Sequence, residues 1–421
     1  MHGSQADKFS EGSLGRLESA LQQVIDSQRI AGAVTLIWRK GEMAHAAAAG
    51  YRDLKAQVPM TRDTLFRIAS MTKPVVSLAA LLLMQEDKLR LEDPVTRWLP
   101  ELADMQVLND PAGPLDDTTP AWRQITVEDL LTHRSGLAAG YTASGPIAEA
   151  YTARLRSWLT DPMSPDEWLK VIGALPLLYS PGERFHYGCS LDALGFLIAR
   201  IEGKGLGTVL RTRIFEPLGM HDTFFWTPPE KRHRLARLYR TPEQAGPLKE
   251  VSFTELPAAP AFESGSGGLI STADDYLKFV QLLLGCGTVD GVHVAAGHTI
   301  ALMSANRLTP SQRALPFAGA VNYWATRGFG LGLSMILERP MTGYRGPNPG
   351  AYGWPGAFGT WWLADPSEDM ALVYMTQDYV TLDSAALGQI LSGERPPGRA
   401  AFEQLAYAAI PECALRPSSK G

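Results

Sequence analysis

The stretch Thr64-Leu65-Phe66-Arg67-Ile68-Ala69-Ser70-Met71-Thr72-Lys73 leads from an extended segment into the first turn of a helix. Pro74 is compatible with such a turn, because a proline there loses no intrahelical hydrogen bond. The spacing of Ser70 and Lys73 places a hydroxyl and an amine on one face of the turn. The helix is predicted because apolar residues follow at helical spacing, namely Val75, Leu78, Ala79, Leu82 and Leu83.

Ser70 and Lys73 are candidates for a catalytic nucleophile and its base. A serine at the start of a helix lies near unpaired backbone N–H groups and the positive end of the helix dipole, where an oxyanion is stabilised. A neighbouring amine can activate the hydroxyl near neutral pH only where burial disfavours its charged form. The same four residues also fit an N-capping serine beside a solvated lysine, so the assignment depends on further motifs.

The second motif is Ser180-Pro181-Gly182-Glu183-Arg184-Phe185-His186-Tyr187, a turn that precedes a helix predicted over 191–201. Tyr187 is a candidate general base or proton relay, provided that its phenol faces a cleft and that nearby positive charge favours its ionised form. The alternative is a half-buried tyrosine whose hydroxyl contacts water. We interpret the nearby His133 as a structural hydrogen-bonding residue rather than a catalytic one.

The third motif is Tyr352-Gly353-Trp354-Pro355-Gly356-Ala357-Phe358-Gly359-Thr360-Trp361-Trp362, whose glycines predict a strand edge that approaches a ligand closely. An N–H from Ala357 opposite that of Ser70 would form an oxyanion hole. The alternative is an aromatic strand that only packs on the core, with one of Trp361 and Trp362 pointing inward and the other outward. The candidate substrate-binding residues are Trp354, Gly356 and Tyr141.

Length and composition describe a mildly acidic globular protein. The 421 residues carry a net charge of −5, which favours neither nucleic acid nor an anionic membrane surface as a partner. The three widely spaced cysteines, Cys189, Cys286 and Cys413, predict free thiols in a reducing compartment. No signal-like or membrane-spanning apolar run and no metal-binding His or Cys spacing occurs, so we expect a cytoplasmic bacterial enzyme with no metal and no cofactor. Oligomeric state is left open.

The order of predicted elements indicates an α/β (α+β) fold. A helix over 14–25 and a hairpin of strands 32–39 and 43–51 begin the chain, whereas strands over 328–337, 357–364 and 370–376 and a helix over 401–409 end it. The middle is mostly helical. We therefore predict an antiparallel sheet domain flanked by helices and built from residues 1–100 and 260–421, a mainly helical domain over 101–259, and an active site in the cleft between them.

These motifs together resemble the class C β-lactamase and penicillin-recognising serine hydrolase superfamily, and within it the family VIII carboxylesterases. The resemblance covers nearly the whole chain and implies a β-lactamase-like fold. It also implies that Ser70 is acylated, that Lys73 and Tyr187 form its base pair, and that 354–357 border the site. The matching segments are Ser70-Met71-Thr72-Lys73, Leu130-Leu131-Thr132-His133-Arg134-Ser135-Gly136-Leu137, Pro181-Gly182-Glu183 leading to Tyr187, Gly267-Gly268-Leu269-Ile270-Ser271-Thr272-Ala273-Asp274-Asp275, and Trp354-Pro355-Gly356.

Two departures from the superfamily pattern favour an esterase. Tyr187-Gly188-Cys189 and Trp354-Pro355-Gly356 stand where β-lactamases carry Tyr-x-Asn and Lys-Thr-Gly. A thiol is a weak substitute for a carboxamide, and an indole offers only one N–H and an apolar face to a lactam carboxylate. We therefore expect a serine carboxylesterase for small, uncharged, short-chain acyl esters. The alternatives are, in order, an acyltransferase to an alcohol, a weak β-lactam (cephalosporin) hydrolase, and a non-catalytic ligand-binding module.

Overall fold

The protein is described by a computed structural model that covers residues 9, 11–157, 159–242, 246–253, 256, 258–317, 322–339 and 345–411. Cys413 therefore lies outside the described residues. Cys189 is a buried free thiol and Cys286 an exposed one.

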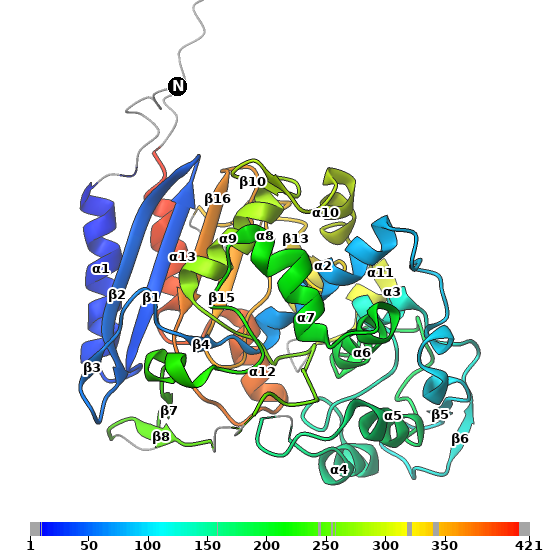
Figure 1. Ribbon diagram of the computed structural model, residues 1–421. Helices are drawn as coiled ribbons and strands as arrows, with labels where there is room; N and C mark the ends of the chain where they lie inside the picture. The colour runs from blue at the N-terminus through cyan, green and yellow to red at the C-terminus, as the bar shows by residue number, and fades with distance from the viewer. Residues whose placement is uncertain are drawn as a thin grey trace, which may run out of the picture.

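Eight strands form one antiparallel sheet that combines both ends of the chain (Figure 1). The strand order is β12-β13-β14-β15-β16-β1-β2-β3, and β16 joins β1 in a register that runs from Val34–Met375 to Arg39–Met370. This arrangement confirms the predicted fold. The strands are β1 (Gly32–Arg39), β2 (Glu42–Asp53), β3 (Val58–Pro59), β12 (Arg327–Phe329), β13 (Ser334–Ile336), β14 (Tyr352–Gly353), β15 (Trp361–Asp365) and β16 (Met370–Met375).

Helices cover both faces of this sheet. On one face α1 (Glu11–Asp26) and α13 (Arg399–Ala408) pack together, and on the other α9 (Ala273–Leu284) packs against β15 and β16. Trp361 belongs to the core on the α1–α13 face, whereas Trp362 belongs to the core on the α9 face. Both rings are therefore buried, and the expectation that one of them points outward is wrong because the sheet has no solvent-facing side at β15.

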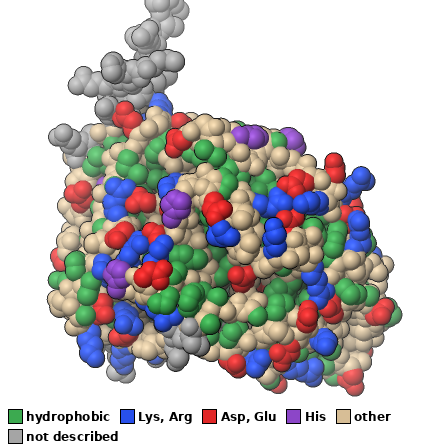
Figure 2. Space-filling model, viewed as in Figure 1, with side chains coloured by type: hydrophobic (Ala, Val, Ile, Leu, Met, Phe, Trp, Pro, Cys, Tyr) green, Lys and Arg blue, Asp and Glu red, His purple; other side chains and the backbone are tan. Residues whose placement is uncertain are grey.

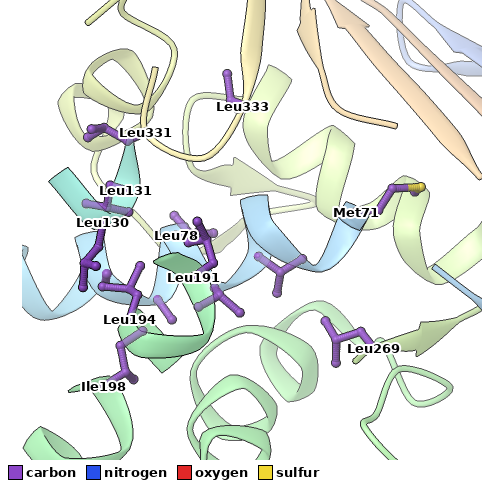
Figure 3. Close-up of a cluster of buried hydrophobic side chains, with 14 of the residues drawn as sticks. Met71, Leu78, Leu130, Leu131, Leu191, Leu194, Ile198, Leu269, Leu331 and Leu333 are labelled. Carbon is purple, nitrogen blue, oxygen red and sulfur yellow. The ribbon is translucent and has the colours of Figure 1, made fainter. Parts of the chain in front are cut away.

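The middle of the chain is helical, as predicted, and packs on α2 (Thr72–Gln85), the helix that follows Ser70. Figure 3 shows this contact: Leu78 of α2 lies beside Leu130 and Leu131 of α3 and beside Leu191 and Leu194 of α6. The limits proposed for the two domains stay a prediction. The helices of this part are α3 (Val127–Leu131), α4 (Gly145–Arg154), α5 (Pro165–Gly173), α6 (Ser190–Glu202), α7 (Leu206–Leu210) and α8 (Glu216–Leu218).

Shorter elements connect these two parts. Segments 106–108 and 118–120 pair in a small two-stranded sheet, in which Val107 and Leu108 are buried. The remaining strands form the pairs β4 (Phe66–Arg67) with β9 (Ile270–Ser271), β5 (Gln106–Leu108) with β6 (Thr118–Pro120), β7 (Leu238–Arg240) with β8 (Lys249–Val251), and β10 (Thr288–Val289) with β11 (Val292–His293). The remaining α-helices are α10 (Gly297–Met303), α11 (Pro310–Arg313) and α12 (Ser384–Ser392).

The surface carries mixed charges. On the face drawn in Figure 2, Lys and Arg side chains are interspersed with Asp and Glu side chains. Within the described part of the chain, no helix has the length and apolar character needed to cross a lipid bilayer.

Candidate active site

Ser70 lies in a tight turn between β4 and α2. In this turn, η2 (Ala69–Met71), the first hydrogen bond runs from the Met71 N–H to the Ile68 carbonyl. The Ser70 N–H comes one residue earlier and is therefore not a donor within the turn. Ala69 has a φ of 44°, a left-handed conformation that is uncommon for a residue with a side chain and that concentrates at functional sites. Ser70 is half-buried, so its hydroxyl stands at the boundary between the core and solvent.

The hydroxyl of Ser70 meets both of its predicted partners. Lys73 Nζ lies 3.1 Å from Ser70 Oγ, and Tyr187 Oη donates a hydrogen bond to the same oxygen over 2.8 Å. Lys73 Nζ also lies 4.6 Å from the centroid of the Tyr187 ring, within range of a cation–π contact. Lys73 is 1% exposed and Tyr187 3%, so neither fits the alternatives of a solvated lysine and a tyrosine whose hydroxyl contacts water.

The amine of Lys73 has a second partner that the sequence analysis missed. Its Nζ donates to the backbone carbonyl of Ser266 over 2.6 Å. Segment 264–268 looks like a glycine-rich connection in the sequence, but here it supplies a carbonyl oxygen to the site. Every residue has a backbone carbonyl, so no residue type in the sequence indicates this contact.

Trp354 packs beside Tyr187. Its ring is 1% exposed, and its indole Nε1–H donates to Tyr187 Oη over 3.2 Å. The indole N–H, the one polar group that Trp354 could offer to a substrate, is therefore already bonded to Tyr187. Trp354 belongs to an aromatic and aliphatic cluster whose other buried members are Tyr187, Leu308, Phe317, Trp324, Phe329, Leu387 and Leu391.

His133 packs beside Tyr187, with ring centroids 4.6 Å apart. Burial lowers the pKa of His133 well below its usual value, and the charge of Lys73 lowers it further, so the imidazole is neutral. Its carbonyl accepts the His186 N–H over 2.7 Å and its Nδ1 accepts the Gly188 N–H over 3.5 Å, while Nε2 has no partner among the described residues. The structural interpretation of His133 is supported, although its ring acts more through packing than through hydrogen bonds.

Ala357 lies in a turn rather than on a strand edge, which corrects the strand expected to begin at this residue. The Gly356 N–H bonds the Thr360 carbonyl, the Gly359 N–H bonds the Gly356 carbonyl, and Gly359 has a φ of 89°. Thr360 Oγ1 ties this turn to the Ile68 carbonyl, two residues before Ser70, over 3.0 Å. The side chain of Ala357 packs in one cluster with Ala69. The oxyanion hole of Ser70 and Ala357 stays a prediction.

Gly356 and Tyr141 also border this region. A β-carbon on Gly356 would lie 2.3 Å from the Ile68 carbonyl oxygen, so only glycine permits this approach to the nucleophile turn. Tyr141 is half-buried against the cluster that contains Tyr187 and Trp354. Burial raises the pKa of the Tyr141 phenol well above its usual value, so it is neutral. Their roles in binding substrate remain predictions.

Together the fold and this site are those of a serine hydrolase of the β-lactamase type, in which a lysine and a tyrosine flank Ser70. The chain belongs to the Beta-lactamase family, whose model matches residues 17–392.

Three similar proteins span almost the same length. The chain is 46% identical to Protein Rv1367c of Mycobacterium tuberculosis over 375 residues, which cover 88% of this chain and 92% of that protein. It is 30% identical to Esterase EstB of Burkholderia gladioli, over 86% of this chain and 89% of that protein. Among solved structures, EstCE1, described as a hydrolase with promiscuous acyltransferase activity, matches with a TM-score of 0.74 and 27% identity over 90% of this chain and 98% of that one. These similarities confirm the expected relationship to esterases with a β-lactamase-like fold.

Proposed function

We propose that the protein hydrolyses small, uncharged, short-chain carboxylic esters through an acyl-enzyme on Ser70. That it is a serine ester hydrolase follows from its family and from its similarity to esterases. The observation that carries the assignment of residues is the pair of contacts at Ser70 Oγ, 2.8 Å to Tyr187 Oη and 3.1 Å to Lys73 Nζ. Nucleophile and base within hydrogen-bond reach are the requirement for this chemistry.

In the first half-reaction, Ser70 Oγ attacks the ester carbonyl carbon while its proton passes to the Lys73–Tyr187 pair. The carbonyl oxygen becomes an oxyanion, for which the N–H groups of Ser70 and Ala357 are the proposed donors. The tetrahedral intermediate collapses, the ester C–O bond breaks, and the alcohol leaves with the proton held by the pair. In the second half-reaction the pair accepts a proton from water, which attacks the acyl-enzyme and releases the acid with Ser70 restored.

A second candidate is transfer of the acyl group to an alcohol. The similarity to EstCE1, which is described as a hydrolase with promiscuous acyltransferase activity, supports this second candidate beside hydrolysis. The same acyl-enzyme serves both reactions, and the outcome depends on whether water or an alcohol reaches it first. Product analysis with an added alcohol distinguishes the two, because transfer gives a new ester and hydrolysis gives only the acid.

The test combines labelling with a panel of substrates. A fluorophosphonate is expected to modify Ser70, and p-nitrophenyl acetate and butyrate are expected to be cleaved faster than the octanoate, the laurate or a chromogenic cephalosporin. Ser70→Ala and Lys73→Met are expected to abolish turnover. Ser77→Ala is the matched control, because Ser77 is a buried serine of α2, the helix that follows Ser70, and its hydroxyl has no partner among the described residues. Turnover that survives Ser70→Ala, or labelling at another residue, would refute the proposal.

A further inference from the structure

A buried carboxylate lies behind Lys73, on the first turn of α6. Asp192 Oδ1 accepts the Ser266 backbone N–H over 3.0 Å and the Ser264 hydroxyl over 2.7 Å. The carbonyl of the same Ser266 accepts Lys73 Nζ over 2.6 Å. The carboxylate of Asp192 and the amine of Lys73 thus bond the N–H and the carbonyl of the same residue, and the amine also contacts Ser70 Oγ.

The second observation concerns the charges around this connection. Burial raises the pKa of the Cys189 thiol and the Tyr141 phenol and lowers the pKa of the His133 and His186 imidazoles, so these four neighbours are neutral near neutral pH. Tyr187 faces the amine as a phenol ring. Asp192 is 7% exposed, and burial raises its pKa above the usual value, because the bonds from Ser264 and Ser266 and the charge of Lys73 offset burial only in part. Among these groups, Asp192 is the acid and Lys73 the base whose charges interact.

We propose that Asp192 is a positioning residue for ester hydrolysis. Its carboxylate holds the Ser266 N–H and so keeps the backbone of this residue where the Ser266 carbonyl accepts Lys73 Nζ beside Ser70, and its negative charge acts on that amine. This inference rests on the proposed function of Ser70 and Lys73 and extends it to a residue that does not touch the substrate. A backbone N–H held by a buried carboxylate restricts the position of its residue, and the carbonyl of that residue is thereby kept within reach of the amine.

Substitution by asparagine separates the charge from the hydrogen bonds. Because one oxygen accepts both bonds, Asp192→Asn can keep them while removing the negative charge. Without that charge the base loses its proton more easily, so the acid limb of the pH profile of kcat/KM is expected to move to lower pH by about half to one unit. The plateau of kcat is expected to stay within about threefold of the wild type, because the geometry is kept.

Substitution by alanine removes the bonds as well. Asp192→Ala leaves the Ser266 N–H without this acceptor and loosens the backbone that carries the Ser266 carbonyl. We expect kcat to fall about tenfold or more at unchanged KM, since Asp192 is proposed to position Lys73 and not to bind substrate. Asp365→Asn is the matched control. Asp365 is a fully buried carboxylate of β15 that bonds Asn348 and Tyr407, so its loss disturbs the fold without reaching Ser266. The control is expected to leave the acid limb in place, and the unfolding midpoints of all variants are measured alongside.

The pH profiles, the kcat values and the labelling of Ser70 have three distinguishable outcomes. A shifted acid limb in Asp192→Asn together with an unshifted limb in Asp365→Asn supports the inference. An unmoved limb in Asp192→Asn, or a folded Asp192→Ala variant with wild-type kcat, overturns it while the wild type remains an active esterase. A wild type that neither reacts with the fluorophosphonate at Ser70 nor cleaves any ester refutes the proposed function and this inference with it.

Discussion

Replacing Trp354 by phenylalanine removes one hydrogen-bond donor from the proposed site and keeps an aromatic ring in its place. The indole Nε1–H donates to Tyr187 Oη over 3.2 Å, and Tyr187 in turn donates to Ser70 Oγ. The Trp354 ring lies 5.5 Å from the Tyr187 ring and 5.2 Å from that of Phe329, measured between centroids. A phenylalanine preserves much of this packing, so the lost N–H is the main change near the hydroxyl of Tyr187.

The size of the effect follows from the charge that Tyr187 carries during the reaction. A hydrogen bond between neutral groups contributes about 1 kcal/mol, and one to a charged group up to about 3 kcal/mol. If Tyr187 gains negative charge as the proton leaves Ser70, the bond from Trp354 strengthens in the transition state. Since about 1.4 kcal/mol corresponds to a factor of ten, kcat/KM of Trp354→Phe is expected to fall by about five- to hundredfold, chiefly through kcat.

The assay is steady-state hydrolysis of p-nitrophenyl butyrate, with Trp362→Phe as the matched control. Trp362 is fully buried, and its Nε1 has no partner among the described residues, so the same substitution there removes comparable volume and no hydrogen bond. The control is expected to lower stability and to leave kcat/KM within about twofold of the wild type. Equal losses of activity in the two variants, or wild-type activity in Trp354→Phe, would refute the reasoning.

Two further predictions concern the turn beside the nucleophile and the pH dependence of stability. Gly356→Ala places a β-carbon 2.3 Å from the Ile68 carbonyl oxygen, so the turn that contains Ala357 must move. We therefore expect kcat/KM for ester hydrolysis to fall by about tenfold or more. Full activity of this variant would contradict the prediction. Burial raises the pKa of Asp378 to about 6, although Arg395 opposes the shift. A carboxyl group whose pKa is higher in the folded than in the unfolded protein stabilises the fold while it is protonated. This stabilisation is lost as pH rises through the pKa of the folded state. The free energy of unfolding of the wild type relative to Asp378→Asn should therefore decline by up to about 3 kcal/mol between about pH 4 and pH 7 in urea titrations, and a constant difference would contradict it.

Local patterns in the sequence predicted much of the fold. The spacing of apolar residues in α1 and α2 and the hairpin of β1 and β2 each depend on neighbours within a few residues. The joining of both chain ends in one sheet followed from the order of elements. The burial of both Trp361 and Trp362 did not, because it depends on helices more than thirty residues away that cover the two faces of β15.

The contacts of the candidate site were likewise predictable from the sequence only where the residues are close in the chain. Ser70 and Lys73 are three residues apart in the sequence, so their contact follows from helix geometry, whereas the approach of Tyr187 could be inferred only from a family resemblance. Ser266 contributes a carbonyl that any residue would supply. Asp192 resembles an ordinary acidic residue at the start of a helix, and only the fold shows that its carboxylate faces inward.

The charges at the site bear on which substrates it can accept. Lys73 Nζ contacts Ser70 Oγ and the Ser266 carbonyl, and Asp192 bonds the N–H of the same residue, so the partners of this amine lie within the protein. Trp354 stands where lactam-binding relatives carry a lysine, and its one N–H is already used by Tyr187. A carboxylate on a substrate would therefore gain no charge partner from these groups and would lose its hydration on entering. An uncharged ester avoids this cost, which is why we expect simple acyl esters to be cleaved faster than a cephalosporin.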